Sequence, residues 1–351
     1  MKKFRAAVLV NQKQPLQIAE INFQGSLLPG QVCCKIHYSG ICGSQLGEID
    51  GVKGEDKFLP HLLGHEGSGV VEQIGPGVTR VSPGDSVVLH WKPSAGIQAE
   101  PPKYDWEGRL VNAGWVTTFN EMAVVSENRL TKIPQGSDMK IAALFGCAVT
   151  TGFGVVTNDA KVKIADSVLV MGAGGIGLNI IQAAQLSCGY PIIAVDLFEN
   201  RLALAKKYGA THTINSSNMS VEDLKKSVRA IVSEGDLDVF IDNTGVTSLI
   251  EFGYSEISKI GKIVLVGVPK AGSNINIFSL PLHFGKQILG SHGGNCQPDL
   301  DIPRYMSLMT AGKVSFDDLI SETFDIEDIN TAISAMRDGS LAGRCMIRMG
   351  V

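Results

Sequence analysis

The sequence has no long run of basic residues and no large excess of charge of either sign. Its 351 residues include 31 Lys and Arg against 35 Asp and Glu, which gives a net charge of −4. Nucleic acids and anionic membranes are bound through basic patches, so we expect neither as a partner. The composition favours a small-molecule partner.

Segments that direct export or membrane insertion are also missing. The opening MKKFRAAVLV has a charged start, but its apolar run stops at Asn11, so no signal peptide is expected. Ser167–Val195 carries no charge and is long enough to span a bilayer. However, it contains closely spaced glycines and Pro191, and it divides into shorter units. We therefore expect no membrane span and a cytoplasmic location.

No CxxC pair occurs among the seven cysteines, and their number is odd. Disulfide scaffolds and zinc knuckles both need closely spaced cysteines. The cysteines are therefore expected to be reduced, and no local zinc knuckle is predicted.

What the chain does contain indicates two domains, the expected number for its length. Residues 6–130 hold short β-rich runs such as QVCCKIHYSG and DSVVLHW between Gly/Pro turns, which predict a partly open barrel. From about Gly152, strands alternate with helices, which predicts a parallel sheet covered on both faces. Periodicity assigns the tail after Gly290 to neither domain.

The run VLVMGAGGIGL places Gly172, Gly174 and Gly177 as GxGxxG between a strand and a helix. The first glycine permits the turn, the second lets the backbone approach a pyrophosphate, and the third lets the helix pack on the strand. The helix N-terminus then offers N–H groups to the phosphates. With Gly175 and Ile176, these residues predict a dinucleotide site.

Two further residues bear on the choice of dinucleotide. Asp196 ends the next strand, where its carboxylate accepts hydrogen bonds from ribose hydroxyls and repels a 2′-phosphate. Arg201 argues mildly for NADP, because it can reach a phosphate, but it can equally cover the ribose or the adenine edge. We expect NAD.

GHEGSGVVEQIGPGV, residues 64–78, fits the signature of zinc-containing alcohol dehydrogenases. Further matching segments follow in that family's order: GICGS at 40–44, PGDSVV at 83–88, GCAVTTG at 146–152 and GR at 343–344. By these motifs the chain resembles the zinc-dependent medium-chain dehydrogenases over essentially its whole length.

This resemblance implies an α/β fold with two domains. A GroES-like β-barrel catalytic domain would comprise residues 1–151 and 291–351, and a Rossmann coenzyme domain with a doubly wound parallel sheet would comprise residues 152–290. The resemblance also implies that Cys42, His65 and Cys147 hold a catalytic zinc, with water or Glu66 in the remaining position. Two thiolates balance the charge of the ion, and the open position receives the alcohol.

Other roles follow from the same resemblance. Ser44 is expected to accept the hydroxyl proton, and Arg344 to lie near the pyrophosphate and Glu66, with a surface salt bridge as its alternative role. The resemblance adds Thr151 and Val266 to the cofactor site, and Gln45, Trp91 and Phe119 to the substrate pocket, with His90 and Lys92 close by.

The chain departs from the family pattern at three places. No cysteine lies between His90 and Arg129, where many members hold a structural zinc, so we expect one zinc per chain and a loop held by packing. Gln45 stands where Asp is common, and because an amide carries no charge, His65 should donate more weakly to the metal. Gly47 replaces a relay histidine, so protons are expected to leave from Ser44 through the cofactor ribose or water.

The predicted function is a zinc-dependent oxidoreductase. It would transfer a hydride between an alcohol, polyol or sugar derivative and NAD, giving an aldehyde or ketone, as a homodimer or homotetramer. Three alternatives stay open from the sequence: a zinc-free quinone reductase relative, a nicotinoprotein that keeps NAD permanently bound, and a non-catalytic NAD-binding protein.

Overall fold

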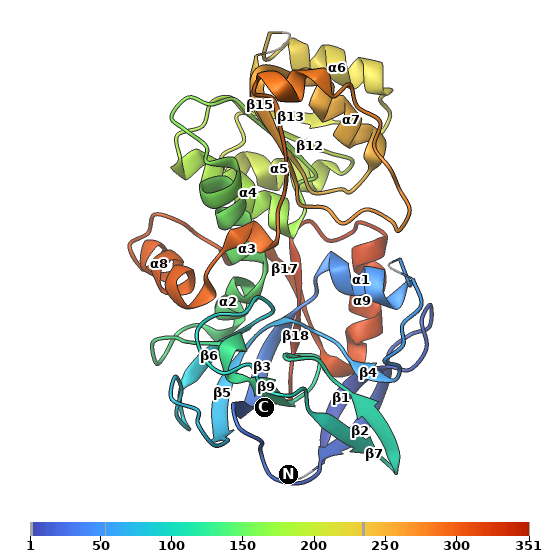
Figure 1. Cartoon of the computed structure of the whole chain (residues 1–351), viewed down its shortest axis with the longest axis vertical. Coiled ribbons are helices and arrows are strands. Elements are labelled where there is room, and N and C mark those ends of the chain that lie inside the picture. The colour runs from blue at the N-terminus through green and yellow to red at the C-terminus, as the bar shows by residue number, and fades with distance from the viewer. Residues whose placement is uncertain (1–2, 53, 234–235, 351) are drawn as a thin grey trace. The chain divides into compact units, whose positions relative to one another are not determined.

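The computed structural model describes residues 3–52, 54–233 and 236–350, and it divides into two compact units (Figure 1). Unit 1 consists of Met1–Ala148 and Gln297–Val351, and unit 2 of Val149–Cys296. These boundaries lie within a few residues of the predicted ones. From Gln297 on, the tail that periodicity left unassigned belongs to unit 1.

Unit 1 contains two β-sheets. One is a closed barrel in the order β1-β2-β7-β8-β4, where a partly open barrel was expected; the other has seven strands in the order β10-β6-β5-β3-β18-β17, with β9 paired to β3. In Figure 1 the red strands β17 and β18 therefore extend a sheet begun by the blue β3. The strands are β1 Phe4–Leu9, β2 Gln17–Phe23, β3 Gln31–Gly40, β4 His61–Leu62, β5 Glu66–Ile74, β6 Ser86–His90, β7 Lys103–Trp106, β8 Arg109–Asn112, β9 Met122–Ser126, β10 Leu130–Lys132, β17 Ile320–Asp325 and β18 Arg344–Arg348, and the helices are α1 Gly43–Ile49, α2 Met139–Ala143, α8 Pro298–Thr310 and α9 Ile329–Arg337.

Strand β3 separates the two hydrophobic cores of unit 1. Successive side chains of a strand point to opposite faces, so Cys33 packs in one core while Cys34 and Ile36 pack in the other. Burial raises the pKa of the Cys33 thiol to about 12. Cys33 and Cys34 are thus packing residues, whereas Cys188 is exposed.

The segment without structural-zinc cysteines is not the loop that the sequence suggested. It contains a hairpin, β7–β8, whose strands join the barrel. Glu107 and Gly108 both have positive φ, the conformation of a two-residue hairpin turn. Tyr104 is buried, and its hydroxyl accepts a hydrogen bond from Val124 N at 2.9 Å. Packing of this ring therefore holds the hairpin to the barrel.

Unit 2 is a six-stranded, wholly parallel sheet in the order β13-β12-β11-β14-β15-β16. This is the strand order of the Rossmann fold, as predicted. Its elements are α3 Ala148–Gly154, which begins at the last residue of unit 1, β11 Val168–Met171, α4 Gly175–Leu186, β12 Ile192–Asp196, α5 Glu199–Lys207, β13 His212–Asn215, α6 Val221–Arg229, β14 Leu237–Asp242, α7 Thr247–Glu256, β15 Ile257–Leu265 and β16 Gln287–Gly290. Strand β15 begins at Ile257, directly after α7, and Ile257 pairs with Leu237 of β14.

The uncharged stretch Ser167–Val195 is divided among β11, α4 and β12. Within the described residues, no single helix is long and apolar enough to cross a membrane. One bent pair of helical segments, Met139–Gly146 and Ala148–Ala160, passes that test by length and composition only.

Candidate metal centre and cofactor site

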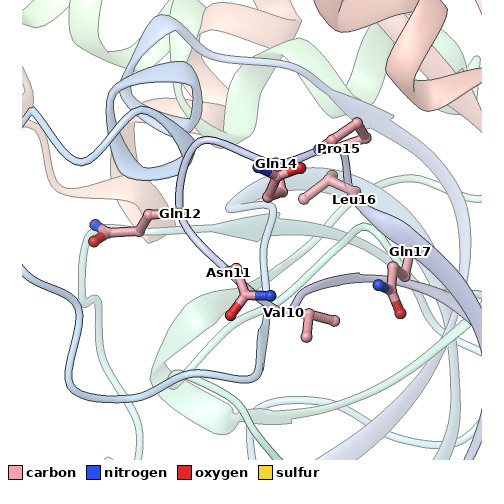
Figure 2. A pocket seen from close by; sticks show the side chains of 7 residues that line it. All are labelled: Val10, Asn11, Gln12, Gln14, Pro15, Leu16 and Gln17. Carbon is pink, nitrogen blue, oxygen red and sulfur yellow. The ribbon is translucent and has the colours of Figure 1, made fainter.

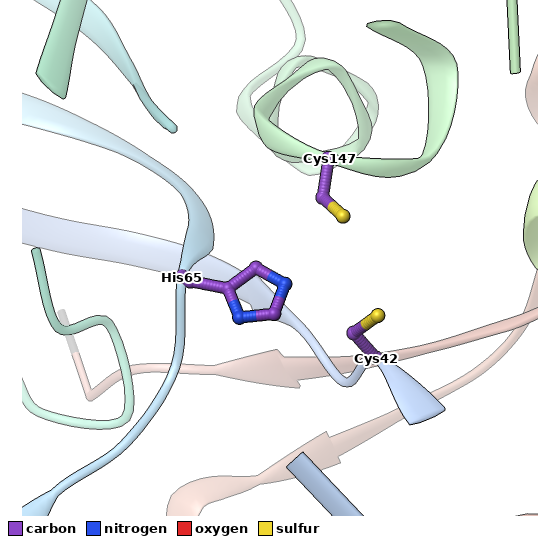
Figure 3. A group of neighbouring side chains, drawn as sticks. All are labelled: Cys42, His65 and Cys147. Carbon is purple, nitrogen blue, oxygen red and sulfur yellow. The ribbon is translucent and has the colours of Figure 1, made fainter. Parts of the chain in front are cut away.

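Three side chains of unit 1 converge as the motifs predicted. The ligand atoms of Cys42, His65 and Cys147 all lie within 4.8 Å of one another, and both cysteines are buried (Figure 3). Cys42 is the residue before α1, His65 precedes β5, and Cys147 follows the helical turn Leu144–Gly146. Two thiols and one imidazole at this spacing suit tetrahedral Zn²⁺ with one open position, the ligand set for which alcohol dehydrogenases are known.

Glycines allow these segments to meet. Gly64 has a φ of +89°, and an added Cβ there would overlap Thr118 Oγ1. A Cβ at Gly146 would overlap the carbonyl oxygen of Leu89. The turn before His65 and the approach of Cys147 therefore both depend on the absence of a side chain.

The electrostatics of the cluster favour a bound cation. A hydrogen bond with Cys147, aided by the charge of Arg344 and by His65, holds the pKa of the Cys42 thiol well below its usual range, although burial opposes this. The same hydrogen bond and burial raise the pKa of Cys147 well above its usual range. Burial lowers the pKa of His65, but the interaction with Cys42 outweighs burial and raises it. A thiolate, the form that binds metals, is thus already favoured at Cys42.

Gln45 links two of the three ligands. Its Oε1 accepts a hydrogen bond from Cys42 N at 2.7 Å, and its Nε2 lies 2.7 Å from His65 Nδ1. Only 1% of Gln45 is exposed. The residue therefore bonds both the Cys42 backbone and the His65 ring, and it fixes the orientation of that ring.

Glu66 and Arg344 form a buried ion pair beside the cluster. Arg344 Nε donates to Glu66 Oε1 at 2.9 Å and Nη2 donates to Oε2 at 2.7 Å, while Ala148 N also donates to Oε2 at 3.1 Å. Arg344 is 4% exposed and Glu66 is fully buried, so the alternative of a surface salt bridge is wrong. Arg344 thus binds both carboxylate oxygens of Glu66, and Glu66 is not among the residues whose ligand atoms cluster within 4.8 Å.

Ser44, the predicted proton acceptor, follows Cys42 by two residues in α1. Its Oγ is buried and has no hydrogen-bond partner among the described residues. Buried hydroxyls are usually paired, so this Oγ keeps its hydrogen-bonding capacity for a ligand.

The predicted pocket walls divide into two groups. Trp91 meets His65 edge to face, with ring centroids 6.5 Å apart. Phe119 is fully buried in the core, and neither Phe119 nor Trp91 lines the cavity described below. His90 is also fully buried; its Nδ1 lies 2.7 Å from Lys92 O and its Nε2 3.0 Å from Thr131 Oγ1. Phe119 and His90 thus have structural roles. The hydrophobic pattern of one segment does not reveal such roles, because they depend on contacts with other segments.

A cavity of about 870 Å³ opens in unit 1 next to Gln45 and His65. Its wall includes residues that the sequence analysis did not identify, chiefly the exposed aromatics Phe58 and Trp115 and the acidic residues Glu48, Glu55, Asp56 and Glu100. In the sequence, only the position of Phe58 and Trp115, each in a polar loop, indicates that these aromatic residues could line a cavity. Of the three cysteine and histidine residues that cluster, His65 lines this cavity.

A second hollow, of about 530 Å³, lies between β1 and β2 (Figure 2). Its lining is Val10, Asn11, Gln12, Gln14, Pro15, Leu16 and Gln17. None of these side chains titrates or is a preferred metal ligand, so this hollow supplies no catalytic group.

The glycine motif of unit 2 has the conformation that a pyrophosphate requires. Gly172 has a φ of +91°, and a Cβ at Gly177 would overlap the Gly172 carbonyl oxygen. A Cβ at Gly174 would meet nothing within 4 Å. Open space therefore lies over the backbone at the N-terminus of α4, which begins at Gly175 and Ile176, and this space fits a dinucleotide phosphate.

Asp196 lies at the end of β12, next to this turn. Its Oδ2 accepts a hydrogen bond from Ala173 N at 2.7 Å and its Oδ1 accepts one from Phe198 N at 3.1 Å. Arg201 lies over the Phe198 ring at 4.6 Å, and its Nη1 is 3.8 Å from Asp196 Oδ1. The arginine thus contacts the carboxylate that would hold a ribose, which agrees with a role in covering the ribose.

Thr151 and Val266 were also predicted at the cofactor site. Thr151 is buried within α3, and Val266 directly follows β15, where its N–H donates to Asp242 O at 2.8 Å. Ligands of Rossmann sheets bind outside the carboxyl ends of the strands, which is where Val266 lies.

Comparison with known proteins agrees with this geometry. Residues 28–135 match the alcohol dehydrogenase GroES-like domain, and residues 175–311 match the zinc-binding dehydrogenase domain. Alcohol dehydrogenase class-3 of Cereibacter sphaeroides is 30% identical over 366 residues, covering 95% of this chain and 97% of that protein. The chain belongs to the zinc-containing alcohol dehydrogenase family.

Two other members of the family support this. A probable S-(hydroxymethyl)glutathione dehydrogenase of Schizosaccharomyces pombe is 31% identical, covering 98% of this chain and 97% of that protein. The crystal structure of benzyl alcohol dehydrogenase from Acinetobacter calcoaceticus superposes with a TM-score of 0.88 at 30% identity over the full length of both chains. The predicted fold and reaction class are therefore confirmed: the chain is an NAD-dependent, zinc-containing alcohol dehydrogenase.

Proposed function

We propose that Ser44 is the group that takes the hydroxyl proton when this enzyme oxidises an alcohol. Zinc on Cys42, His65 and Cys147 would polarise the substrate oxygen, and NAD would accept the hydride. The observation that carries the proposal is the buried, unpartnered Oγ of Ser44 on the same helix as Gln45. Gln45 and the Glu66–Arg344 pair hold the surrounding ligands in place.

Ser44→Ala tests this role, with Ser44→Thr as the control that keeps the hydroxyl. Loss of a positioned acid–base group reduces kcat by about 10²- to 10⁴-fold, whereas Ser44→Thr should keep most of the activity. Zinc content should be the same in both. Equal activity of Ser44→Ala and the wild type would contradict the proposal.

We also propose that the substrate is a bulky alcohol, such as a polyol or sugar derivative. Ligand cavities span about 300–1,000 Å³, and the 870 Å³ here lies near the upper end. Aromatic rings and carboxylates in the wall suit the faces and hydroxyls of a ring-shaped polyol. NAD reduction should be measured at 340 nm over alcohols, polyols and nucleotide-sugars; a preference for ethanol would count against this substrate class.

One zinc per chain is the third proposal. The Glu127 carboxylate connects two segments of unit 1, as a structural zinc ion would. Its Oε1 accepts hydrogen bonds from Thr79 N at 2.7 Å and Arg80 N at 2.8 Å, and its Oε2 accepts one from Ile97 N at 2.8 Å. Together with the β7–β8 hairpin, this carboxylate ties the segment between His90 and Arg129 to its neighbours. Metal analysis that finds two zinc ions per chain would contradict it.

The fourth proposal is a homodimer formed through unit 2. Strand β16 is an edge strand, and exposed edges are templates for pairing with another chain. Exposed apolar side chains occur nearby at Ile260, Phe278 and Phe284. Phe284→Lys should yield monomers by light scattering after gel filtration, whereas Ile164→Lys, at another exposed apolar residue, should not.

A further inference from the structure

The orientation of the Gln45 amide is set by Cys42. A backbone N–H only donates, so the amide atom that lies 2.7 Å from Cys42 N is the oxygen. The NH₂ group therefore faces His65 Nδ1, also at 2.7 Å. In this arrangement Nδ1 is the acceptor and carries no proton.

The other ring nitrogen of His65 points toward the gap between the two sulfur atoms (Figure 3). It is Nε2, because Nδ1 faces Gln45. An ion held at Nε2 uses the lone pair of that atom, so a neutral ring keeps its proton on Nδ1. Nδ1 must then donate, and the group that it faces must accept.

When the metal is bound, two donors therefore face Gln45, Cys42 N–H and His65 Nδ1–H, but its amide has only one acceptor oxygen. A carboxylate at this position has two oxygens and accepts from both. Rotation of the amide only exchanges one unpaired donor for the other. Since Gln45 is 1% exposed, water does not readily replace the lost bond.

We propose that Gln45 is a positioning residue that weakens metal binding, because it supplies one hydrogen-bond acceptor too few for the loaded site. This inference rests on the zinc centre formed by Cys42, His65 and Cys147. It predicts that Gln45→Glu, which has the same length and two acceptor oxygens, binds Zn²⁺ about 10- to 100-fold more tightly than the wild type, the range typical of groups that hydrogen-bond a metal ligand.

The test measures Zn²⁺ affinity by competition with a chelator in the full-length wild type, Gln45→Glu, Gln45→Leu and Gly47→Glu. Gly47→Glu controls for the added charge: a Cβ there meets only Val52 Cβ, at 3.9 Å. It lies two residues beyond Gln45 in α1, so its side chain leaves the helix on another face. The expected order of affinity is Gln45→Glu, then the wild type and Gly47→Glu together, then Gln45→Leu. Equal affinities of wild type and Gln45→Glu, or equal tightening by both Glu variants, would overturn the inference.

Binding of Co²⁺ separates this inference from the metal centre itself. A thiolate-to-cobalt absorption band in the wild type shows that the two cysteines hold the ion. If that band is absent, the metal centre fails and the inference with it. If it is present while the order of affinities differs from the one expected, only the role of Gln45 is wrong.

Discussion

In unit 1 the metal centre consists of side chains from three separated segments, at residues 42, 65 and 147, whereas in unit 2 the phosphate-binding turn consists of backbone within residues 172–177. The first depends on the identity of each ligand atom and of the groups that orient it. The second depends on the absence of side chains. A site made of side chains therefore fails when one functional group is removed, and a site made of backbone fails when a functional group is added.

Removal of one metal ligand gives the largest expected effect. Cys147→Ala should lose the zinc and reduce kcat/KM by about 10³-fold or more, because Lewis-acid assistance contributes several kcal/mol. NAD affinity, measured by fluorescence titration, should stay near the wild-type value. A parallel loss of NAD binding would show that the two sites depend on each other.

His90 shows that a histidine in unit 1 can be structural. Burial lowers its pKa to about 4, although hydrogen bonds with the backbone oppose this. The unfolded chain titrates near 6.5, so only the unfolded state gains a proton between pH 6.5 and 4, and stability falls as the pH falls through that range. The loss should be about 3 kcal/mol in total. Urea unfolding of wild type and His90→Gln at pH 7 and pH 5 measures the part of this loss above pH 5, about 2 kcal/mol; identical pH dependence would contradict this.

Addition of a side chain in unit 2 is the converse experiment. Gly174→Val fills the open space over the turn, so a dinucleotide phosphate should lose its backbone hydrogen bonds and KM for NAD should rise about 10- to 100-fold. Zinc content should not change. Unaltered KM in Gly174→Val would place the phosphates elsewhere.

The smallest expected effect concerns Asp196, the carboxylate beside the glycine turn of unit 2. Asp196→Gly removes the acceptor for ribose hydroxyls and the charge that repels a 2′-phosphate, so KM for NAD should rise about 10-fold. KM for NADP should change less. Steady-state kinetics with both cofactors gives the ratio, and equal changes would argue against Asp196 as the residue that selects NAD.

The sequence predicted the site made of backbone more completely than the site made of side chains. Gly172, Gly174 and Gly177 are adjacent in the chain, so local spacing determines their geometry. The ligands Cys42, His65 and Cys147 were assigned only through resemblance to a family, because no spacing rule connects segments this far apart.

Other features depend on tertiary contacts that no motif encodes. The Gln45 amide is oriented by Cys42 N, and this backbone group is not visible as a sequence signal. Phe119, which lies between β8 and β9, belongs to the core together with side chains from several strands. The β7–β8 hairpin has no clear sequence signal, because its strands are short and its turn, Glu107-Gly108, lacks the usual Asn or Asp.

The Glu66–Arg344 pair sets an order of events during synthesis of the protein. The two residues are 278 positions apart, and all of unit 2 lies between them in the chain. A ribosome therefore completes unit 2 before Glu66 can acquire its counter-charge from β18. Until then the Glu66 carboxylate, next in the chain to His65, has no guanidinium partner, so the coenzyme-binding fold can mature first and the metal centre last.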